Sequence, residues 1–150
     1  TDTECRVFHD VVVDGFNIDH VMVSRRGVFA IETKTYSKPK KGRAVIKYVG
    51  DTLIINDVRE TKDELIQAKA AANWLKNFFK ETLDRRFEVK PVLLFPGWYI
   101  ENGGRDDVWV LEPKAFAKFF ENQSVVWEKD EVLKLSTTLS RFIRDSAKFG

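Results

Sequence analysis

Two apolar segments decide the fold of this chain: Asn17-Ile18-Asp19-His20-Val21-Met22-Val23-Ser24 and, after a short turn, Gly27-Val28-Phe29-Ala30-Ile31-Glu32-Thr33-Lys34. Both segments are rich in Val, Ile and Phe, and their spacing predicts two neighbouring antiparallel strands. Asp19, Glu32 and Lys34 are set into these apolar runs. A buried charge is tolerated only when it is paired or bound to a metal. The hairpin therefore predicts either a metal site or an internal ion pair.

The rest of the chain predicts a mixed sheet flanked by helices, an α/β (α+β) fold. A preceding strand completes a meander, and a second hairpin can extend the same sheet. From Thr61 the hydrophobic period becomes helical, and Thr61 and Glu64 stand at capping-box spacing. The expected elements are strands 6–14, 17–24, 27–34, 44–49 and 52–55, a helix 61–83, strands 89–95 and 108–111 joined across a polar loop 101–107, a helix 113–122 and a final helix from Asp130.

The composition indicates one folded domain spanning residues 1–150. A chain of 17.4 kDa with 43% hydrophobic residues can bury a full core. The net charge is only +2, so nucleic-acid binding would have to depend on local clusters of charge. Cys5 is the only cysteine, which excludes an internal disulfide and favours a cytoplasmic location. No apolar run reaches the roughly 18 residues that cross a bilayer, so no membrane partner is expected. The oligomeric state stays open.

The register of the first hairpin decides whether the carboxylates meet. Glu32 and Lys34 project to the same face, being two residues apart on a strand. With a two-residue loop at Arg25-Arg26, Asp19 lies directly opposite Glu32, with Cβ atoms about 5 Å apart. Such a pair repels unless a cation such as Mg²⁺ or Mn²⁺ lies between the carboxylates. A bulge at Gly27 would shift the pairing by one residue.

Two interpretations of these charged residues remain. In the first, Asp19 and Glu32 hold a divalent ion that activates water, while the Lys34 ammonium orients the water or offsets charge on a phosphate. That is the chemistry of hydrolysis. In the second, the carboxylates lie in solvent near the strand ends and Lys34 simply pairs with Glu32.

Four separated blocks of sequence resemble the nuclease-related domain called NERD, a branch of the PD-(D/E)XK nuclease superfamily. The blocks are Ile18-Asp19-His20-Val21, Gly27 to Lys34, Gln67-Ala68 and Phe95-Pro96-Gly97-Trp98, within residues 7–111. The resemblance implies a restriction-endonuclease-like core and hydrolysis of DNA phosphodiester bonds with Mg²⁺ or Mn²⁺. It implies that Asp19 and Glu32 bind the metal, that Lys34 is the catalytic lysine, and that Gln67 borders the site.

One departure from the family pattern keeps alternatives open. The family places a helix with a glutamate ahead of its first strand; we expect this sequence to lack that helix, and Glu4 is a poor substitute. A non-catalytic nucleic-acid-binding or regulatory module is therefore the alternative function. A structural partner domain, or one part of a longer chain with other domains, is a further possibility.

A basic segment follows the second strand of the hairpin. Lys38, Lys40, Lys41 and Arg43 are expected to contact the phosphates of DNA, with RNA as an alternative partner. A solvated surface loop is the other interpretation. Trp98 and Tyr99 are candidates for base stacking, although an aromatic plug at a strand exit is the better explanation.

Overall fold

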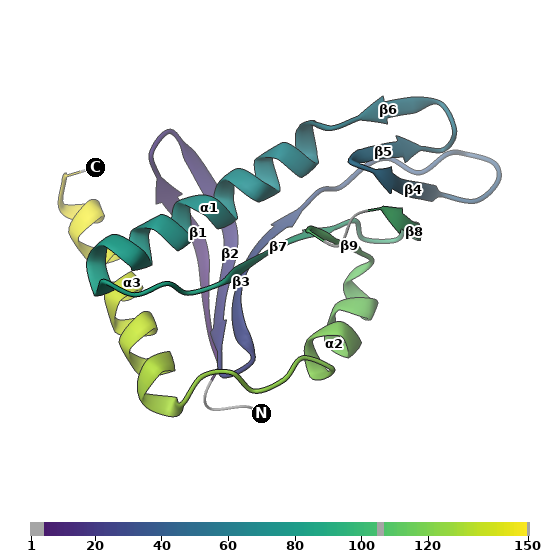
Figure 1. The fold of residues 1–150 in the computed structure, drawn as a ribbon. Coiled ribbons are helices and arrows are strands. Elements are labelled where there is room, and N and C mark those ends of the chain that lie inside the picture. The colour runs from purple at the N-terminus through teal and green to yellow at the C-terminus, as the bar shows by residue number, and fades with distance from the viewer. Residues whose placement is uncertain (1–4, 105–106, 150) are drawn as a thin grey trace.

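The computed structural model describes residues 5–104 and 107–149, which form nine strands and three helices (Figure 1). In chain order the elements are β1 (Arg6–Val13), β2 (Phe16–Ser24), β3 (Gly27–Thr33), β4 (Val45–Gly50), β5 (Thr52–Ile55), β6 (Arg59–Thr61), α1 (Asp63–Leu83), β7 (Val89–Leu94), β8 (Tyr99–Gly104), β9 (Trp109–Leu111), α2 (Pro113–Glu121) and α3 (Lys129–Phe149).

A five-stranded mixed sheet forms the centre, in the order β1-β2-β3-β7-β9. The first three strands are antiparallel, whereas β7 runs parallel to β3 and β9 parallel to β7. The middle strand β3 is buried from Val28 to Glu32. A strand buried on both faces needs the continuous apolar run that its sequence has. The predicted meander and the predicted strand at 89–95 are thus confirmed.

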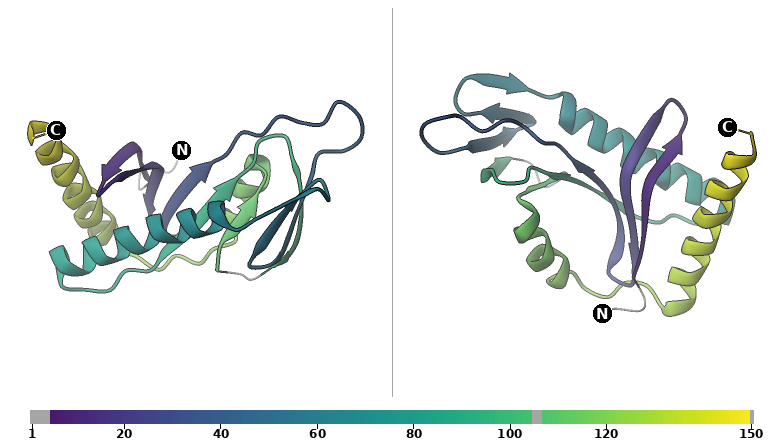
Figure 2. Two further views of the ribbon diagram at one scale, coloured as in Figure 1. Left: turned by 90° about the horizontal axis from the view of Figure 1, so that it is seen from above. Right: turned by 180° about the vertical axis from the view of Figure 1, so that it is seen from behind.

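Helices cover both faces of this sheet (Figure 2). On one face, Ala71 and Leu75 of α1 and Leu135 of α3 join Val21 and Ala30 in a buried apolar cluster. On the other face, α2 packs its phenylalanines against the opposite side of β2, β3 and β7. None of the helices within the described ranges is long and apolar enough to cross a membrane. Because successive side chains of a strand point to opposite faces, the central strands contribute to two separate apolar cores.

The hairpin between β2 and β3 has the register predicted for a two-residue loop. Ser24 pairs with Gly27 and His20 with Ile31. The fully buried Ser24 hydroxyl donates to the Gly27 carbonyl at 2.9 Å and accepts from the Arg26 N–H at 3.2 Å. Gly27 has φ +138°, a conformation that favours glycine. The serine and the glycine together hold the turn, and no bulge shifts the pairing.

The second hairpin does not extend the central sheet, contrary to the prediction. It belongs to a separate four-stranded sheet in the order β6-β5-β4-β8. Ile46 and Leu53 of this sheet pack with Leu65 of α1 and with Trp98 in their own apolar cluster. Because these side chains are buried against the first turns of α1, the hairpin pairs beside the helix rather than at the edge of the central sheet.

The predicted polar loop at 101–107 is also wrong, since β8 covers Tyr99–Gly104 and pairs parallel to β4. This strand has no apolar pattern, because Glu101, Asn102 and Gly103 are exposed. It is held mainly by backbone hydrogen bonds to β4. Residues 105 and 106 lie outside the described ranges. Helix α1 begins at Asp63 rather than at Thr61, because Thr61 pairs with Leu53 in β6.

We expect Ser24→Ala to lower the free energy of unfolding by about 1–2 kcal/mol, because it leaves the Gly27 carbonyl and the Arg26 N–H without their shared partner. Urea denaturation measures the change. The matched control is Ser37→Ala at an exposed position, which should stay within about 0.5 kcal/mol of the parent. Equal stability of the two variants would contradict this role for Ser24.

Candidate metal and catalytic site

Asp19 and Glu32 lie beside each other on adjacent strands, on the sheet face that α1 covers. Each stands two residues from a member of the core under α1, namely Val21 on β2 and Ala30 on β3. Asp19 Oδ2 accepts a hydrogen bond of 3.0 Å from the backbone N–H of Thr33, which ties this carboxylate to β3. Glu32 is only 8% exposed. The hairpin register therefore brings the two predicted acids together.

The environment of Glu32 disfavours its ionised form. Burial, followed by the charge of Asp19 and a hydrogen bond with its carboxyl group, raises the pKa of Glu32 from 4.5 to about 7. A hydrogen bond from the Asp19 backbone and the charge of Lys34 act in the opposite direction. Two carboxylates forced together in a poorly solvated place hold a proton or a cation between them. The pair is thus chemically suited to a cation.

Lys34 continues the strand just beyond its last residue. Its backbone N–H donates to the Leu94 carbonyl at 2.9 Å, and its side chain is half-buried. The ammonium is close enough to lower the pKa of Glu32, yet within the described ranges no ion pair joins the two residues. The alternative of a simple Lys34–Glu32 ion pair is therefore not what the structure contains.

Gln67 is exposed on α1, and within the described residues its side chain makes no hydrogen bond. It stands one helical turn before Ala71, which packs in the cluster that contains Val21 and Ala30. No side-chain hydrogen bond or ion pair among the described residues joins Gln67 to Asp19 or Glu32.

Comparison with known protein families matches residues 1–96 to NERD, the nuclease-related domain. The chain belongs to this family. The match covers the hairpin, α1 and β7, and the mixed sheets with three helices agree with the restriction-endonuclease-like core of the PD-(D/E)XK superfamily. No curated protein and no solved structure matches the chain.

The donors that this NERD domain offers to a metal are oxygen atoms. Asp19 and Glu32 provide carboxylates, which hard divalent ions such as Mg²⁺ and Mn²⁺ prefer. Across residues 5–104 and 107–149, no three His, Cys, Asp or Glu side chains gather into one group. Two carboxylates fit an ion that keeps several water ligands. Glu4, weighed above as a substitute acid, lies outside the described residues.

A partly buried hydrogen-bonded pair, which was not predicted from the sequence, anchors the chain just after Lys34. The Tyr36 hydroxyl donates to Glu64 Oε1, and Thr61 Oγ1 donates to Glu64 Oε2 at 2.8 Å. Trp98 Nε1 donates to the Tyr36 carbonyl at 3.3 Å. Burial and the bond to Glu64 raise the pKa of Tyr36 to about 12. The signal was present in sequence, because Tyr36 continues the alternation of Glu32 and Lys34.

The basic segment connects the two sheets and reaches away from the central one, at the right of Figure 1. Lys38 lies across Gly97, where an added Cβ would meet Lys38 Cε at 2.5 Å, and the Arg43 guanidinium stacks on Tyr99 at 4.8 Å. Lys40 and Lys41 are exposed. The four cations are thus distributed along the loop.

The predicted aromatic plug at the exit of β7 is confirmed. Trp98 is only 2% exposed and is held through its indole N–H, so it cannot stack on a base. Tyr99 is 54% exposed, and Arg43 covers its ring.

A cross-strand pair of His9 and His20, whose Nδ1 atoms are 2.8 Å apart, was not predicted from the sequence. That pair follows from the β1–β2 register.

We expect the stability of the metal-free protein to fall as the pH rises from about 4.5 to about 7, because the folded state must then give up a proton that it holds more tightly than the unfolded chain. Glu32→Gln removes this ionisation. The free energy of unfolding of the variant minus that of the parent should therefore increase by on the order of 2 kcal/mol from pH 5 to pH 8. Urea denaturation with a chelator present measures the difference.

The matched control for this experiment is Glu60→Gln, which makes the same exchange at an exposed position on β6. A difference between Glu32→Gln and the parent that is equal at pH 5 and pH 8 would show that Glu32 ionises in the folded protein as it does in the unfolded chain.

Proposed function

We propose that this NERD domain is a metal-dependent nuclease that hydrolyses phosphodiester bonds of DNA with Mg²⁺ or Mn²⁺. One observation carries the proposal: adjacent strands hold Asp19 and Glu32 together in a place where burial and mutual repulsion raise the pKa of Glu32 to about 7, with Lys34 two residues further along. A fold that only needed stability would gain nothing from such a pair.

Each side chain has a role in this proposal. Asp19 and Glu32 hold the ion, and the hydrogen bond from Thr33 fixes the Asp19 carboxylate toward β3. A bound ion would polarise a phosphoryl oxygen and acidify a water molecule. Lys34 donates from its ammonium to the attacking water or to a non-bridging phosphate oxygen, where negative charge develops. Gln67 contacts the substrate from the exposed edge of α1.

The reaction adds one water molecule across one P–O ester bond. The water oxygen bonds to phosphorus and loses a proton, while the ester oxygen leaves and accepts a proton from solvent. The anchoring of Tyr36 by Glu64 and Trp98 supports this step, because it limits the movement of the backbone that carries Lys34. Lys38, Lys40, Lys41 and Arg43 would contact the phosphates that lead to the site.

We expect the parent protein to nick supercoiled plasmid when Mn²⁺ or Mg²⁺ is present, and to leave it intact when a chelator is added. Glu32→Ala and Lys34→Ala should each lower the cleavage rate by about 10²-fold or more, because each removes a group that acts on the reacting atoms. Glu60→Ala is the control, and single-stranded DNA and RNA substrates test the class of nucleic acid. Undiminished cleavage by Glu32→Ala or Lys34→Ala would exclude the proposal.

A non-catalytic nucleic-acid-binding module is the second candidate. It is favoured by the presence of only two carboxylates at the site within the described residues and by the exposed position of Gln67.

The variant Asp19→Asn separates the two candidates. If the domain is a nuclease, we expect Asp19→Asn to lose Mn²⁺ binding in calorimetry and to lose cleavage with it. Full DNA binding by Asp19→Asn, together with no cleavage by the parent at any metal concentration, would favour the second candidate.

A further inference from the structure

The two histidines of the chain meet on neighbouring strands. His9 of β1 pairs directly with His20 of β2, and their Nδ1 atoms are 2.8 Å apart, so one ring donates a hydrogen bond to the other. The rings meet edge to face, with centroids 4.9 Å apart. The β1–β2 register thus brings together both imidazole groups that this sequence contains.

The histidine pair lies on the sheet face opposite Glu32. His20 pairs across the strands with Ile31, which belongs to the apolar cluster under α2. Glu32 is the next residue of β3, so its side chain points to the other face, towards α1. Residues directly opposite each other on neighbouring strands share a face, so His9, His20 and Ile31 form one row on the α2 side. The pair is therefore distinct from the acidic site, although Asp19 and His20 are neighbours in sequence.

Solvent reaches the histidine pair. Strand β1 lies at the edge of the central sheet, His9 is exposed, and His20 is half-buried. Val7, two residues before His9 and therefore on the same face of β1, is 45% exposed. The end of this sheet face that carries β1 is thus open to water. A dissolved ion can approach the two Nδ1 atoms, and the exposed His9 ring has room to turn.

The distance between the two nitrogens is close to that in a two-histidine metal site. Neutral imidazole is a ligand for Zn²⁺, Cu²⁺ and Ni²⁺, whereas Mg²⁺ prefers oxygen. Metal–nitrogen bonds of about 2.0–2.1 Å at angles of about 90–109° place the two ligating nitrogens roughly 2.9–3.4 Å apart. From 2.8 Å, a small rotation of the exposed His9 ring reaches this range. The sheet therefore holds two nitrogen ligands side by side.

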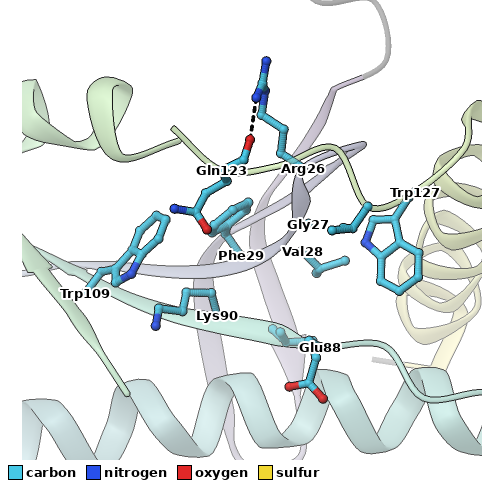
Figure 3. Close-up of a pocket in the computed structure, with 11 residues that line it drawn as sticks. Arg26, Gly27, Val28, Phe29, Glu88, Lys90, Trp109, Gln123 and Trp127 are labelled. Carbon is cyan, nitrogen blue, oxygen red and sulfur yellow. Dashed lines mark hydrogen bonds between the residues drawn. The ribbon is translucent and has the colours of Figure 1, made fainter. Parts of the chain in front are cut away.

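A pocket at the start of β3 has a different character. It has a volume of about 450 Å³ and is lined by aromatic and polar side chains, among them Phe29 and Trp109 (Figure 3). Phe29 and the Lys90 ammonium both contact the Trp109 ring, and the Arg26 guanidinium donates to the Gln123 carbonyl. These side chains already bind one another or the backbone, whereas the histidine pair presents its nitrogens at the surface.

We propose that His9 and His20 bind a divalent transition-metal ion of the class of Zn²⁺, Cu²⁺ and Ni²⁺. The ion takes the place of the hydrogen between the two Nδ1 atoms. That hydrogen moves through solvent to Nε2 of its own ring, so both rings stay neutral and both act as ligands. Two histidines leave the remaining coordination positions to water. The proposal does not depend on the nuclease activity proposed above, because it uses neither Asp19 nor Glu32.

Nitrogen NMR of the protein without a histidine tag tests this proposal, because its two histidines give only two sets of imidazole signals. The titration uses Zn²⁺, with about 10 mM Mg²⁺ present to occupy oxygen-donor sites. We expect both Nδ1 signals to shift together, with a dissociation constant below about 100 μM. His9→Gln and His20→Gln should each weaken binding by about tenfold or more, because each removes one of two ligands. Neither side chain is fully buried, so both variants should fold.

Two control variants should bind Zn²⁺ as tightly as the parent. Val12→Gln introduces the same residue at another exposed position of β1. Glu32→Gln separates the histidine pair from the proposed nuclease site. The inference is overturned if neither imidazole signal shifts up to about 1 mM Zn²⁺. It is also overturned if either histidine variant binds as tightly as the parent, or if Glu32→Gln loses binding.

Discussion

The register of the β2–β3 hairpin is the constraint on which the rest of the structure depends. Strand β3 is buried on both faces, so a shift of one residue would keep apolar side chains on each face but would move Glu32 away from Asp19. Ser24 prevents this by bonding to both the Gly27 carbonyl and the Arg26 N–H within the turn. Asp19 faces Glu32 because the turn holds that register.

The same register places two carboxyl groups, those of Glu32 and Asp19, close together at the end of a buried strand. Glu32 shares a poorly solvated place with Asp19, and its pKa of about 7 is the consequence. Within the described residues no ion pair links Glu32 to Lys34, which leaves the carboxylate pair for another partner. The surrounding chain is nevertheless fixed, since Tyr36 is hydrogen-bonded to Glu64 and its carbonyl accepts from Trp98. Rigid neighbours around a destabilised ionic group are typical of functional sites.

Strand β3 also separates two regions of different chemistry. Glu32, near its end, lies beside Asp19 of β2, whereas Val28 and Phe29, at its start, line an aromatic pocket. Val28 packs in the cluster under α1 and Phe29 in the cluster under α2, because neighbouring side chains of a strand point to opposite faces. The acidic pair and the pocket thus lie toward opposite ends of one strand.

The sequence by itself determined the three-stranded meander and the helices, because hydrophobic period and turn residues are local signals. It left two registers open for the hairpin at Arg25-Arg26, and the structure decided the one that brings Asp19 to Glu32. The tertiary structure alone decided the second sheet, the strand hidden in the polar segment after Tyr99, the Tyr36–Glu64 pair and the pocket under Trp109. Each of these joins residues far apart in the chain. Pairing of that kind depends on which surfaces the packed helices leave available, and local sequence does not record it.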